Sequence, residues 1–237
     1  MKNKIAIITS LFGNYEKLHK PNVIHKNADY FAFIENKTND NIHWNQIVGN
    51  KFSDCHRFSN RRNAKIYKIL PEMFLDYEFF IWTDATHEVI QDPESICQKY
   101  IINPNCDMAV FEHRLRNCIY EEAEEIKKIH ADIPQLIDNQ VEIYKNNYKF
   151  PEKNGLYELP GFVKRVSDKT KSFSLQWWEH ICKFSSRDQI SFPVCAKIHK
   201  LRLCVLPGKT NDMIKNGIIH QIRPHRHEPR GKDYKGV

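Results

Sequence analysis

The sequence predicts an α/β domain whose central sheet is mixed, mostly parallel and flanked by helices. Short apolar runs alternate along the chain with segments of helical periodicity, a pattern typical of strand–helix units around such a sheet. The 237 residues are 41% hydrophobic and 12% aromatic, which is enough to bury a substantial core. Because no repeat or low-complexity linker divides the chain, we expect one domain over residues 1–216. The remainder, 217–237, reads as a basic tail that is either disordered or a flap over a ligand.

In the first half of the chain, apolar and aromatic runs predict strands, and a basic amphipathic segment predicts a helix. The first strand begins at Lys4 and ends in the turn Gly13-Asn14. The helix over 61–70 should stop at Pro71, whose ring cannot continue it. Further strands are expected at 29–35, 77–81 and 107–112, with a short helix at 93–100.

In the second half, apolar side chains recur at helical spacing from 119 to 147, and Pro134 should divide this region into two helices. A short strand is expected at 161–166, after the turn at Asn154-Gly155. The remaining expected elements are a helix at 174–182, a helix that begins near Arg187, and a final strand at 201–206.

Charge and cysteine usage limit the function classes. A formal net charge of +7 attracts anions such as nucleotide diphosphates, and the basic tail is compatible with peripheral contact with an anionic membrane. Tyr234 is the tail's only aromatic residue, so nucleic acid is disfavoured. The apolar runs are too short for a membrane span or signal peptide, so we expect a cytoplasmic protein, with any membrane contact at the inner face. Seven cysteines without CxxC spacing argue against a disulfide framework and predict mostly reduced, buried thiols.

The most informative segment is the polar turn that follows the strand at 77–81. It contains Asp84, Thr86, His87 and Glu88. Ligands of α/β sheets collect outside the carboxyl ends of strands, so this turn predicts a site for a divalent ion and a phosphate ester. Mn²⁺ or Mg²⁺ would suit its oxygen ligands, but Thr86 stands where a second acidic residue is common, so metal dependence is open. An ordinary surface turn would look the same.

A basic face is predicted on the helix over 61–70. Arg61, Lys65 and Lys68 are spaced i, i+4 and i+3, which places them on one side of the helix. Three cations on one face suit a pyrophosphate, because arginine offers a fork of donors and lysine a point charge. A solvated basic face is equally consistent with the pattern.

Asp188 and Gln189 open the helix that begins near Arg187. A carboxylate at a helix N-terminus keeps a low pKa and is well placed by the dipole. It could hold a sugar hydroxyl or accept its proton, or it could be a simple N-cap.

Other candidate residues have weaker patterns. Thr9 to Tyr15, after the first strand, are small or hydroxyl-bearing and would let a nucleotide approach, although they lack the GxGxxG spacing and also fit a tight turn. His113, Arg116 and Glu122 could bind an acceptor or phosphate, or form a salt-bridged helix start. Trp178, like its neighbour Trp177, could stack on a sugar or pack in the core.

Taken in order, these segments resemble one family. It is a glycosyltransferase-like family long catalogued as a domain of unknown function, with bacterial polysaccharide-locus members and plant members tied to mucilage and pectin synthesis. The resemblance spans residues 5 to 206. It rests on Gly13-Asn14-Tyr15, Arg61-x-x-Ala64-Lys65-x-x-Lys68, Trp82-x-Asp84, His113-x-x-Arg116-x-Cys118-x-Tyr120-x-Glu122, Gly155-Leu156-Tyr157-Glu158, Trp177-Trp178-Glu179 and Arg187 to Phe192.

The resemblance implies a GT-A-like fold, a nucleotide-binding α/β sandwich whose central strand ends in a DxD-type metal site. Asp84 falls at the first acidic position of that site and Thr86 at the second. Asp188 and Gln189 look like the Asp-Gln pair that glycogenin-like transferases use near the acceptor, and Asp188 is comparable to the catalytic base of inverting enzymes. The donor side would comprise Thr9, Asn14, Tyr15, Arg61, Lys65 and Asp84. The acceptor side would comprise His113, Arg116, Glu122 and Trp178.

The function expected from these residues is transfer of a sugar from a nucleotide-sugar, with a UDP-sugar favoured, to a hydroxyl of a glycan acceptor. Bacterial surface polysaccharide synthesis is the expected setting. One alternative is a sugar-phosphate nucleotidyltransferase, but the loop after the first strand has one glycine and no arginine nearby, unlike the loop of that class. A second alternative is a module that binds a nucleotide-sugar without catalysis.

Overall fold

A computed structural model describes residues 4–13, 16–39, 43–52, 59–208 and 217–222. Asn14, Tyr15 and the tail beyond residue 222 lie outside the described residues. The described strands are β1 (Ile5–Leu11), β2 (Asp29–Ile34), β3 (Asn45–Val48), β4 (Phe79–Thr83), β5 (His87–Val89), β6 (Met108–Glu112), β7 (Tyr157–Arg165), β8 (Leu203–Val205) and β9 (Ile219–Gln221).

Most helices begin and end close to the predicted positions, but the helix expected at 174–182 begins six residues earlier, at Asp168. The described helices are α1 (Ser59–Ile69), α2 (Pro93–Cys97), α3 (Ile119–Lys128), α4 (Pro134–Asn146), α5 (Asp168–Lys183) and α6 (Asp188–Ile198). A 3₁₀ turn at Pro71–Met73 follows α1, and a π-helical turn at Gln98–Ile102 continues α2. Pro134 is the first residue of α4, a position where its missing N–H costs no helical hydrogen bond.

A seven-stranded sheet organises the domain, in the order β3-β2-β1-β4-β7-β6-β8. The pairs β1–β2, β2–β3, β1–β4 and β6–β8 are parallel, whereas β7 pairs antiparallel with β4 and β6. The predicted α/β class with a mixed, mostly parallel sheet is therefore confirmed. The chain leaves β1 on one side toward β2 and β3, and returns through α1 to β4 on the other side. This reversal between β1 and β4 is the kind of switch point where α/β sheets bind ligands.

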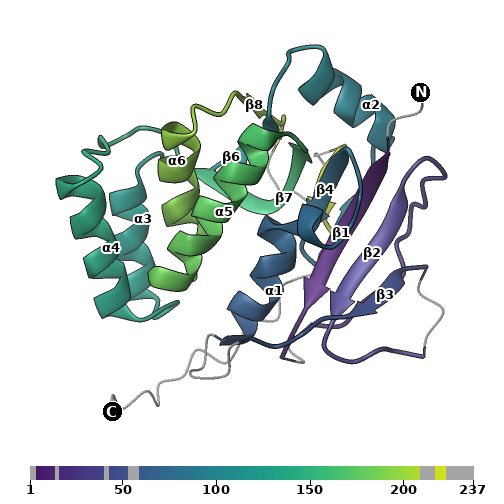
Figure 1. Ribbon diagram of the computed structural model, residues 1–237, viewed down its shortest axis with the longest axis horizontal. Helices are drawn as coiled ribbons and strands as arrows, with labels where there is room; N and C mark the ends of the chain where they lie inside the picture. The colour runs from purple at the N-terminus through teal and green to yellow at the C-terminus, as the bar shows by residue number, and fades with distance from the viewer. Residues whose placement is uncertain (1–3, 14–15, 40–42, 53–58, 209–216, 223–237) are drawn as a thin grey trace.

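Both faces of the central strands are buried. On one face, Ile8, Phe80 and Trp82 pack in a cluster with Trp177 of α5 and Phe192 of α6. The other face packs against the α2 region and β9. Figure 1 shows α1, α5 and α6 in front of the sheet, with α3 and α4 side by side at the left, next to α6. Two-sided burial explains why β1 and β4 read as continuous apolar runs rather than alternating ones.

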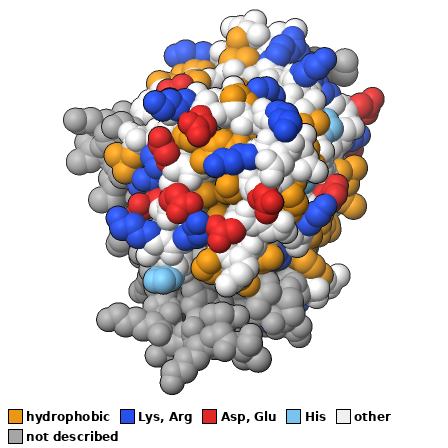
Figure 2. Space-filling view, turned by 90° about the vertical axis from the view of Figure 1, so that its left-hand side faces the viewer, with side chains coloured by type: hydrophobic (Ala, Val, Ile, Leu, Met, Phe, Trp, Pro, Cys, Tyr) orange, Lys and Arg blue, Asp and Glu red, His pale blue; other side chains and the backbone are white. Residues whose placement is uncertain are grey.

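The helices α3 and α4 form an outer layer with its own apolar cluster against α6. On the surface of this layer, Lys127 bridges Glu124 at 2.8 Å and Asp138 at 2.6 Å. Figure 2 faces this side of the molecule, where basic and acidic side chains are interspersed with small hydrophobic areas. Within the described residues, no helix is both long and apolar enough to cross a membrane.

Several elements differ from the prediction. The polar stretch before α1 contains the edge strand β3, and β7 begins at Tyr157, four residues before the expected strand. The turn after β4 continues into β5, which pairs antiparallel with β9, so the first described residues of the expected tail form a strand. Cys106, just before β6, and Cys204 of β8 form a disulfide. The two cysteines are 98 residues apart in the sequence, so no local spacing predicts their pairing. Cys97, Cys118 and Cys195 are free and buried, as expected.

Candidate active site

A cavity of about 680 Å³ lies outside the carboxyl ends of β1 and β4. Ser10 and Leu11 of β1 and Trp82 of β4 form part of its floor, and Asp84 lies directly beyond β4. The volume lies within the range that small-molecule sites occupy. Its remaining walls come from α1, α3, β7, the turn after β4, the segment after β6, the start of α6 and β9.

Charged side chains dominate the lining of this cavity. The basic ones are Arg61, Lys65, Lys68, Arg114, Arg116 and Arg187, and the acidic ones are Glu16, Asp84, Glu122, Glu125, Glu158 and Asp188. Most of the candidate residues predicted from the sequence therefore converge here, from segments far apart in the chain. Apart from Asp84 and Thr86, they lie on two walls, one formed by α1 and α6 and a second formed by α3 and the segment after β6.

The turn at Asp84 is held by backbone hydrogen bonds. The Asp84 N–H donates to the Pro160 carbonyl of β7 at 2.7 Å, and the His87 N–H donates to the Asp84 carbonyl at 2.8 Å. The side chain is fixed as well, because Trp82 Nε1 donates to Asp84 Oδ1 at 2.8 Å. About a third of the Asp84 side chain is exposed (34%), so its carboxylate is oriented but accessible.

On the wall formed by α1 and α6, two lysines share one carboxylate. Lys65 Nζ lies 2.9 Å from Asp188 Oδ1, and Lys68 Nζ lies 2.7 Å from Asp188 Oδ2. The three side chains are 6–11% exposed, so the pairs are largely shielded from solvent. Such burial is favourable only because each charge has a partner at hydrogen-bonding distance.

The ionisation of these groups follows from their burial and their neighbours. Burial alone would raise the pKa of Asp188, but the charges of Lys65 and Lys68 outweigh it and hold the pKa far below its ordinary value. Burial lowers the pKa of Lys65 to about 7, and the charge of Asp188 opposes that shift only in part. Asp188 is therefore a weak base, and Lys65 is a cation that can lose its charge near neutral pH.

The segment before α6 is anchored by Asp132, which lies between α3 and α4. Its Oδ2 accepts hydrogen bonds from the Ser186 N–H at 2.7 Å, from the Ser186 hydroxyl at 2.6 Å and from the Ser185 hydroxyl at 2.9 Å. Arg61 donates to the Ala131 carbonyl at 2.7 Å. Arg61 also contacts the Ser186 hydroxyl, so it connects the segment between α3 and α4 to the segment before α6 in addition to lining the cavity.

Arg187 and Gln189 also line the cavity at the start of α6. Arg187 Nη2 donates to Gln189 Oε1 at 2.9 Å, which orients both side chains. Arg187 Nε is buried and has no hydrogen-bond partner among the described residues. A buried donor without a partner is costly, so an acceptor from a bound ligand or water would satisfy it.

The second wall, formed by α3 and the segment after β6, is organised around Glu122 in the first turn of α3. Arg116 donates to Glu122 Oε2 from Nε and lies at 2.8 Å from it through Nη2 as well. His113 Nδ1 accepts the Arg116 N–H at 3.0 Å, so the neutral ring carries its proton on Nε2, which faces Glu122 at 3.6 Å. Burial lowers the pKa of His113 and keeps the ring neutral. His113, Arg116 and Glu122 therefore form one unit, as their spacing suggested.

The residues predicted for a metal do not fit a divalent ion well. Asp84 offers one accessible carboxylate, and Lys68 Nζ lies 4.0 Å from its Oδ1. Thr86 is buried, and its hydroxyl contacts His87 Nδ1 at 3.1 Å. The Glu88 carboxylate accepts hydrogen bonds from the Asn22 side chain and the Val23 N–H instead. In the described ranges no cluster of three or more His, Cys, Asp or Glu side chains could hold a metal ion.

Two predicted site residues lie elsewhere. Thr9 faces a separate cavity of about 20 Å³, which is large enough for a water molecule. Because side chains alternate along a strand, its neighbour Ser10 faces the larger cavity instead. Trp178 packs edge-on against Phe52, with 5.2 Å between ring centroids, and does not line the cavity. Ser10 rather than Thr9 therefore lines the larger cavity, and Trp178 is not part of that lining.

Some lining residues were not among the predicted ones. Two of them could have been found from the sequence, because Lys68 lies on the predicted basic face and Glu158 belongs to the segment Gly155-Leu156-Tyr157-Glu158. Glu158 accepts a charge-assisted contact from Arg114 Nε at 3.3 Å. Gln221 reaches the cavity because β9 pairs with β5, and Ile222 N–H donates to the Thr86 carbonyl at 2.9 Å. Nothing in the local sequence around Gln221 predicts that long-range pairing.

Fold and site together define an α/β protein with a charged cavity at the carboxyl ends of its central parallel strands. The chain belongs to the TOD1/MUCI70 family: the family model described as "TOD1/MUCI70, glycosyltransferase-like domain" matches residues 1–223. The resemblance inferred from the motifs is therefore confirmed, and the chain is glycosyltransferase-like at the level of its family.

Known relatives include two plant proteins. The chain is 26% identical over 210 residues to "Probable hexosyltransferase MUCI70" of Arabidopsis thaliana, covering 79% of this chain and 36% of that protein. It is 24% identical over 219 residues to "Alkaline ceramidase TOD1" of the same plant, covering 79% of this chain and 47% of that protein. A solved structure, bifunctional glycosyltransferase WbbM in its apo form, matches with a TM-score of 0.46 and 11% identity over 86% of this chain and 38% of that one. The chain thus spans less than half the length of each of these proteins.

Proposed function

We propose that this protein transfers a sugar from a nucleotide-sugar to a hydroxyl of a glycan acceptor. The observation that carries the proposal is the basic wall of the cavity, where Arg61, Lys65, Lys68 and Arg187 gather beside Asp84 at the β1–β4 switch point. Asp188 compensates only part of that charge. Such a wall suits the pyrophosphate of a nucleotide-sugar, and membership in a glycosyltransferase-like family supports the same reading.

In this proposal the donor lies across the carboxyl ends of β1 and β4, with its diphosphate against Lys65 and Lys68. The bond between the anomeric carbon and the phosphate oxygen breaks, and the electron pair leaves with the nucleoside diphosphate. Preorganised cations stabilise the charge that develops on that oxygen, and in a shielded site this effect is large. The acceptor hydroxyl forms the new bond to the anomeric carbon.

The sequence left two roles open for Asp188, holding the acceptor hydroxyl or taking its proton. Its low pKa argues for a positioning role instead, because a carboxylate held by two ammonium groups has little affinity for a proton. A phosphate oxygen, which titrates at roughly pH 6, is the better base. We therefore infer that the proton leaves with the departing diphosphate, while Asp188 fixes the two lysines.

The acceptor would lie on the other wall, near His113, Arg116 and Glu122. Their mutual hydrogen bonds present polar groups to the cavity in a fixed arrangement, as recognition of sugar hydroxyls requires. A glycan of a bacterial surface polysaccharide, a UDP-sugar donor and a cytoplasmic site at the inner membrane face remain the proposed setting, on the basis of the family resemblance and the basic composition.

The direct test is a panel of nucleotide-sugars incubated with the protein, with release of nucleotide as the readout and calorimetric binding of UDP in parallel. The proposal expects binding of UDP or another nucleoside diphosphate, with sugar-dependent nucleotide release when an acceptor glycan is added. Binding without any release would favour a non-catalytic module. Release of pyrophosphate from an NTP and a sugar phosphate would favour a nucleotidyltransferase.

A second experiment tests for ceramide hydrolysis, because one relative is named as a ceramidase. Incubation with a fluorescent ceramide, scored for free fatty acid, should show no turnover. The cavity wall is rich in paired charges, which suits a polar ligand better than an acyl chain. Ceramide hydrolysis, together with absence of nucleotide binding, would refute the proposed function.

A further inference from the structure

The ammonium group of Lys68 lies near two carboxylates of the cavity, those of Asp188 and Asp84. Its Nζ is 2.7 Å from Asp188 Oδ2 and 4.0 Å from Asp84 Oδ1. The same atom is 5.3 Å from the ring centroid of Trp82 and 5.9 Å from that of Phe162. The Lys68 side chain is only 6% exposed. The Lys68 ammonium is therefore surrounded by two carboxylates and two aromatic rings.

The partners of Lys68 are fixed in turn. Trp82 supports the ammonium with its ring and also donates its Nε1–H to Asp84 Oδ1, so a single residue positions both charges. Asp188 is held at the start of α6, and the loop before it is tied to Asp132. A lysine in such surroundings is a preorganised point charge rather than a mobile surface cation.

This position is adjacent to Asp84, the carboxylate at which the sequence predicts a divalent ion. An ion on Asp84 would lie close to the Lys68 ammonium, and like charges at that distance repel. The second acidic position of the motif is occupied by Thr86, which is buried and turned to His87. The donor set at Asp84 thus suits a fixed ammonium better than a hydrated Mg²⁺ or Mn²⁺, which needs several oxygen ligands.

We propose that Lys68 supplies, beside Asp84, the positive charge that a divalent cation supplies in a DxD-type site, so that donor binding and transfer proceed without a divalent metal. The inference rests on the proposed function. In the reaction, the bond from the anomeric carbon to the diphosphate oxygen breaks, and Lys68 stabilises the electron pair that this oxygen retains. Asp84 acts as a positioning residue that holds Lys68 toward the diphosphate.

The first test measures UDP binding by calorimetry in EDTA and then with millimolar Mn²⁺ or Mg²⁺. The expected dissociation constants agree within about twofold across the three conditions. Binding that vanishes in EDTA and returns with Mn²⁺ would overturn the inference and leave the proposed function intact. Absence of UDP binding in all three conditions would instead contradict the proposed function, so the two failures are distinguishable.

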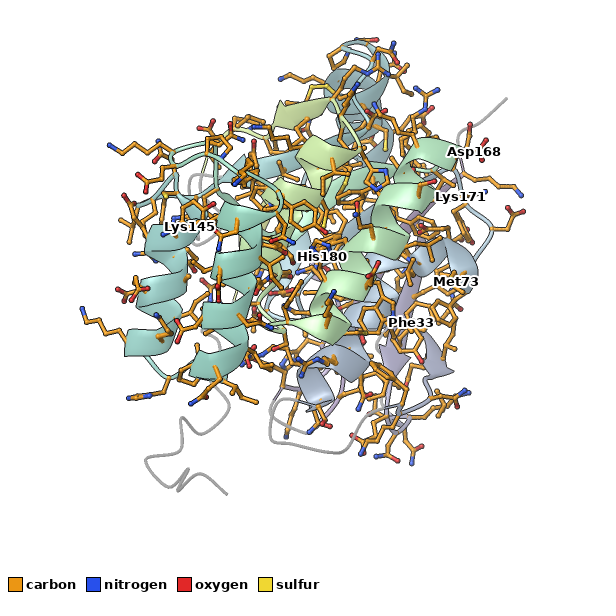
Figure 3. All side chains as sticks on the ribbon, turned by 60° about the vertical axis from the view of Figure 1, so that its left-hand side comes forward. Phe33, Met73, Lys145, Asp168, Lys171 and His180 are labelled. Carbon is orange, nitrogen blue, oxygen red and sulfur yellow. A yellow bond between two sulfur atoms is a disulfide. The ribbon has the colours of Figure 1, made fainter. Side chains whose placement is uncertain are left out.

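The second test removes the charge. Lys68→Met keeps the length and apolar stem of the side chain, and it should weaken UDP binding at least tenfold while leaving uridine binding unchanged. Lys68→Arg, which keeps the charge, should retain more affinity than Lys68→Met. Lys171→Met is the matched control, because Lys171 is exposed near the start of α5 (Figure 3) and lies outside the cavity lining.

Circular dichroism and thermal unfolding of each variant distinguish loss of charge from loss of fold. A folded Lys68→Met protein that binds UDP as tightly as the wild type would refute the role of Lys68. If Lys68→Met does not fold, Lys68→Arg carries the test: a folded Lys68→Arg protein that binds UDP only when Mn²⁺ is added would refute it equally.

Discussion

Lys68 of α1 and Asp188 of α6 are joined by an ion pair of 2.7 Å across 120 residues of sequence. The pair links the basic helix to the helix that carries the predicted catalytic residues Asp188 and Gln189, and Lys65 makes the same link at 2.9 Å. A buried ion pair of this kind stabilises a protein little by itself, but breaking one partner away is costly. It therefore fixes the geometry of the cavity wall and makes that wall sensitive to substitution.

Asp188→Asn should destabilise the fold by about 3–5 kcal/mol, because the two buried ammonium groups lose their counter-charge. Transfer should be lost in the folded protein. Urea unfolding measures the first effect, and a double-mutant cycle with Lys68→Met should show that the combined loss is smaller than the sum of the single losses. Asp168→Asn, at an exposed position in the first turn of α5 (Figure 3), is the control. Wild-type stability and turnover in Asp188→Asn would contradict the assignment.

Asp84→Ala should strongly slow transfer while changing the free energy of unfolding by only about 1 kcal/mol, the scale of one lost hydrogen bond, here from Trp82 Nε1. A fall in turnover of about 10²–10³-fold would match the loss of one preorganised charge-positioning group. Asp84→Asn keeps an acceptor for Trp82 and should be as stable as the wild type. Full turnover in Asp84→Ala would contradict the proposed role of Asp84 in transfer.

Binding of UDP should weaken as the pH rises through about 7, because Lys65 then loses the positive charge that attracts the diphosphate. The sign follows from burial, which lowers the pKa of Lys65 and makes the neutral form accessible. Ionisation of the terminal phosphate, at roughly pH 6, acts in the opposite direction. Comparison with Lys65→Arg, which stays charged, isolates the lysine. The same pH profile in both proteins would refute the prediction.

Asp132→Ala should lower the turnover measured as sugar-dependent release of nucleotide, although Asp132 does not line the cavity. The substitution leaves the Ser186 N–H and the hydroxyls of Ser185 and Ser186 without their acceptor, and each such loss costs about 1–3 kcal/mol. The loop before Asp188 would then be free to shift. Asp138→Ala removes an exposed carboxylate from α4 and should change neither stability by more than about 1 kcal/mol nor the release rate.

Glu122→Gln should raise the KM for the acceptor and leave the KM for the donor unchanged. The amide keeps the volume of Glu122 but weakens its charge-assisted bonds to Arg116, so the wall near His113 loses its fixed arrangement. Steady-state kinetics with each substrate varied in turn measures the split. A rise in the KM for the donor alone would contradict the assignment of Glu122 to acceptor binding.

Much of the architecture could be predicted because local patterns determine it. The aromatic run Phe79 to Trp82 reads as a buried strand, and a polar turn directly after it must lie at a sheet edge. The i, i+3 and i, i+4 spacing of α1 likewise fixes which cations share a face. These relations depend on neighbours within a few residues, so the sequence is sufficient to reveal them.

Relations between distant segments were less accessible. The position of Asp188 at a helix start left open whether it caps the helix, holds a hydroxyl or accepts a proton. Its ion pairs with Lys65 and Lys68 lower its pKa further, and the approach of these lysines to α6 follows from the packing of whole helices. Trp178 was placed at the acceptor because tryptophan often stacks on sugars, whereas the direction of its helical face turns it toward Phe52. The disulfide between Cys106 and Cys204 has the same origin, since β6 and β8 become neighbours only in the folded sheet.

The pairing of β9 with β5 sets the smallest fragment of this chain that can contain a whole site. Ile219 packs so closely on Gly161 of β7 that a Cβ there would meet it at 2.6 Å, and Gln221 completes the cavity wall. A protein shortened at residue 216, the expected domain boundary, would lose both and expose the apolar surface beneath Ile219. Any fragment prepared for crystallisation or library screening should therefore extend at least to Ile222, whose N–H closes the turn at Thr86.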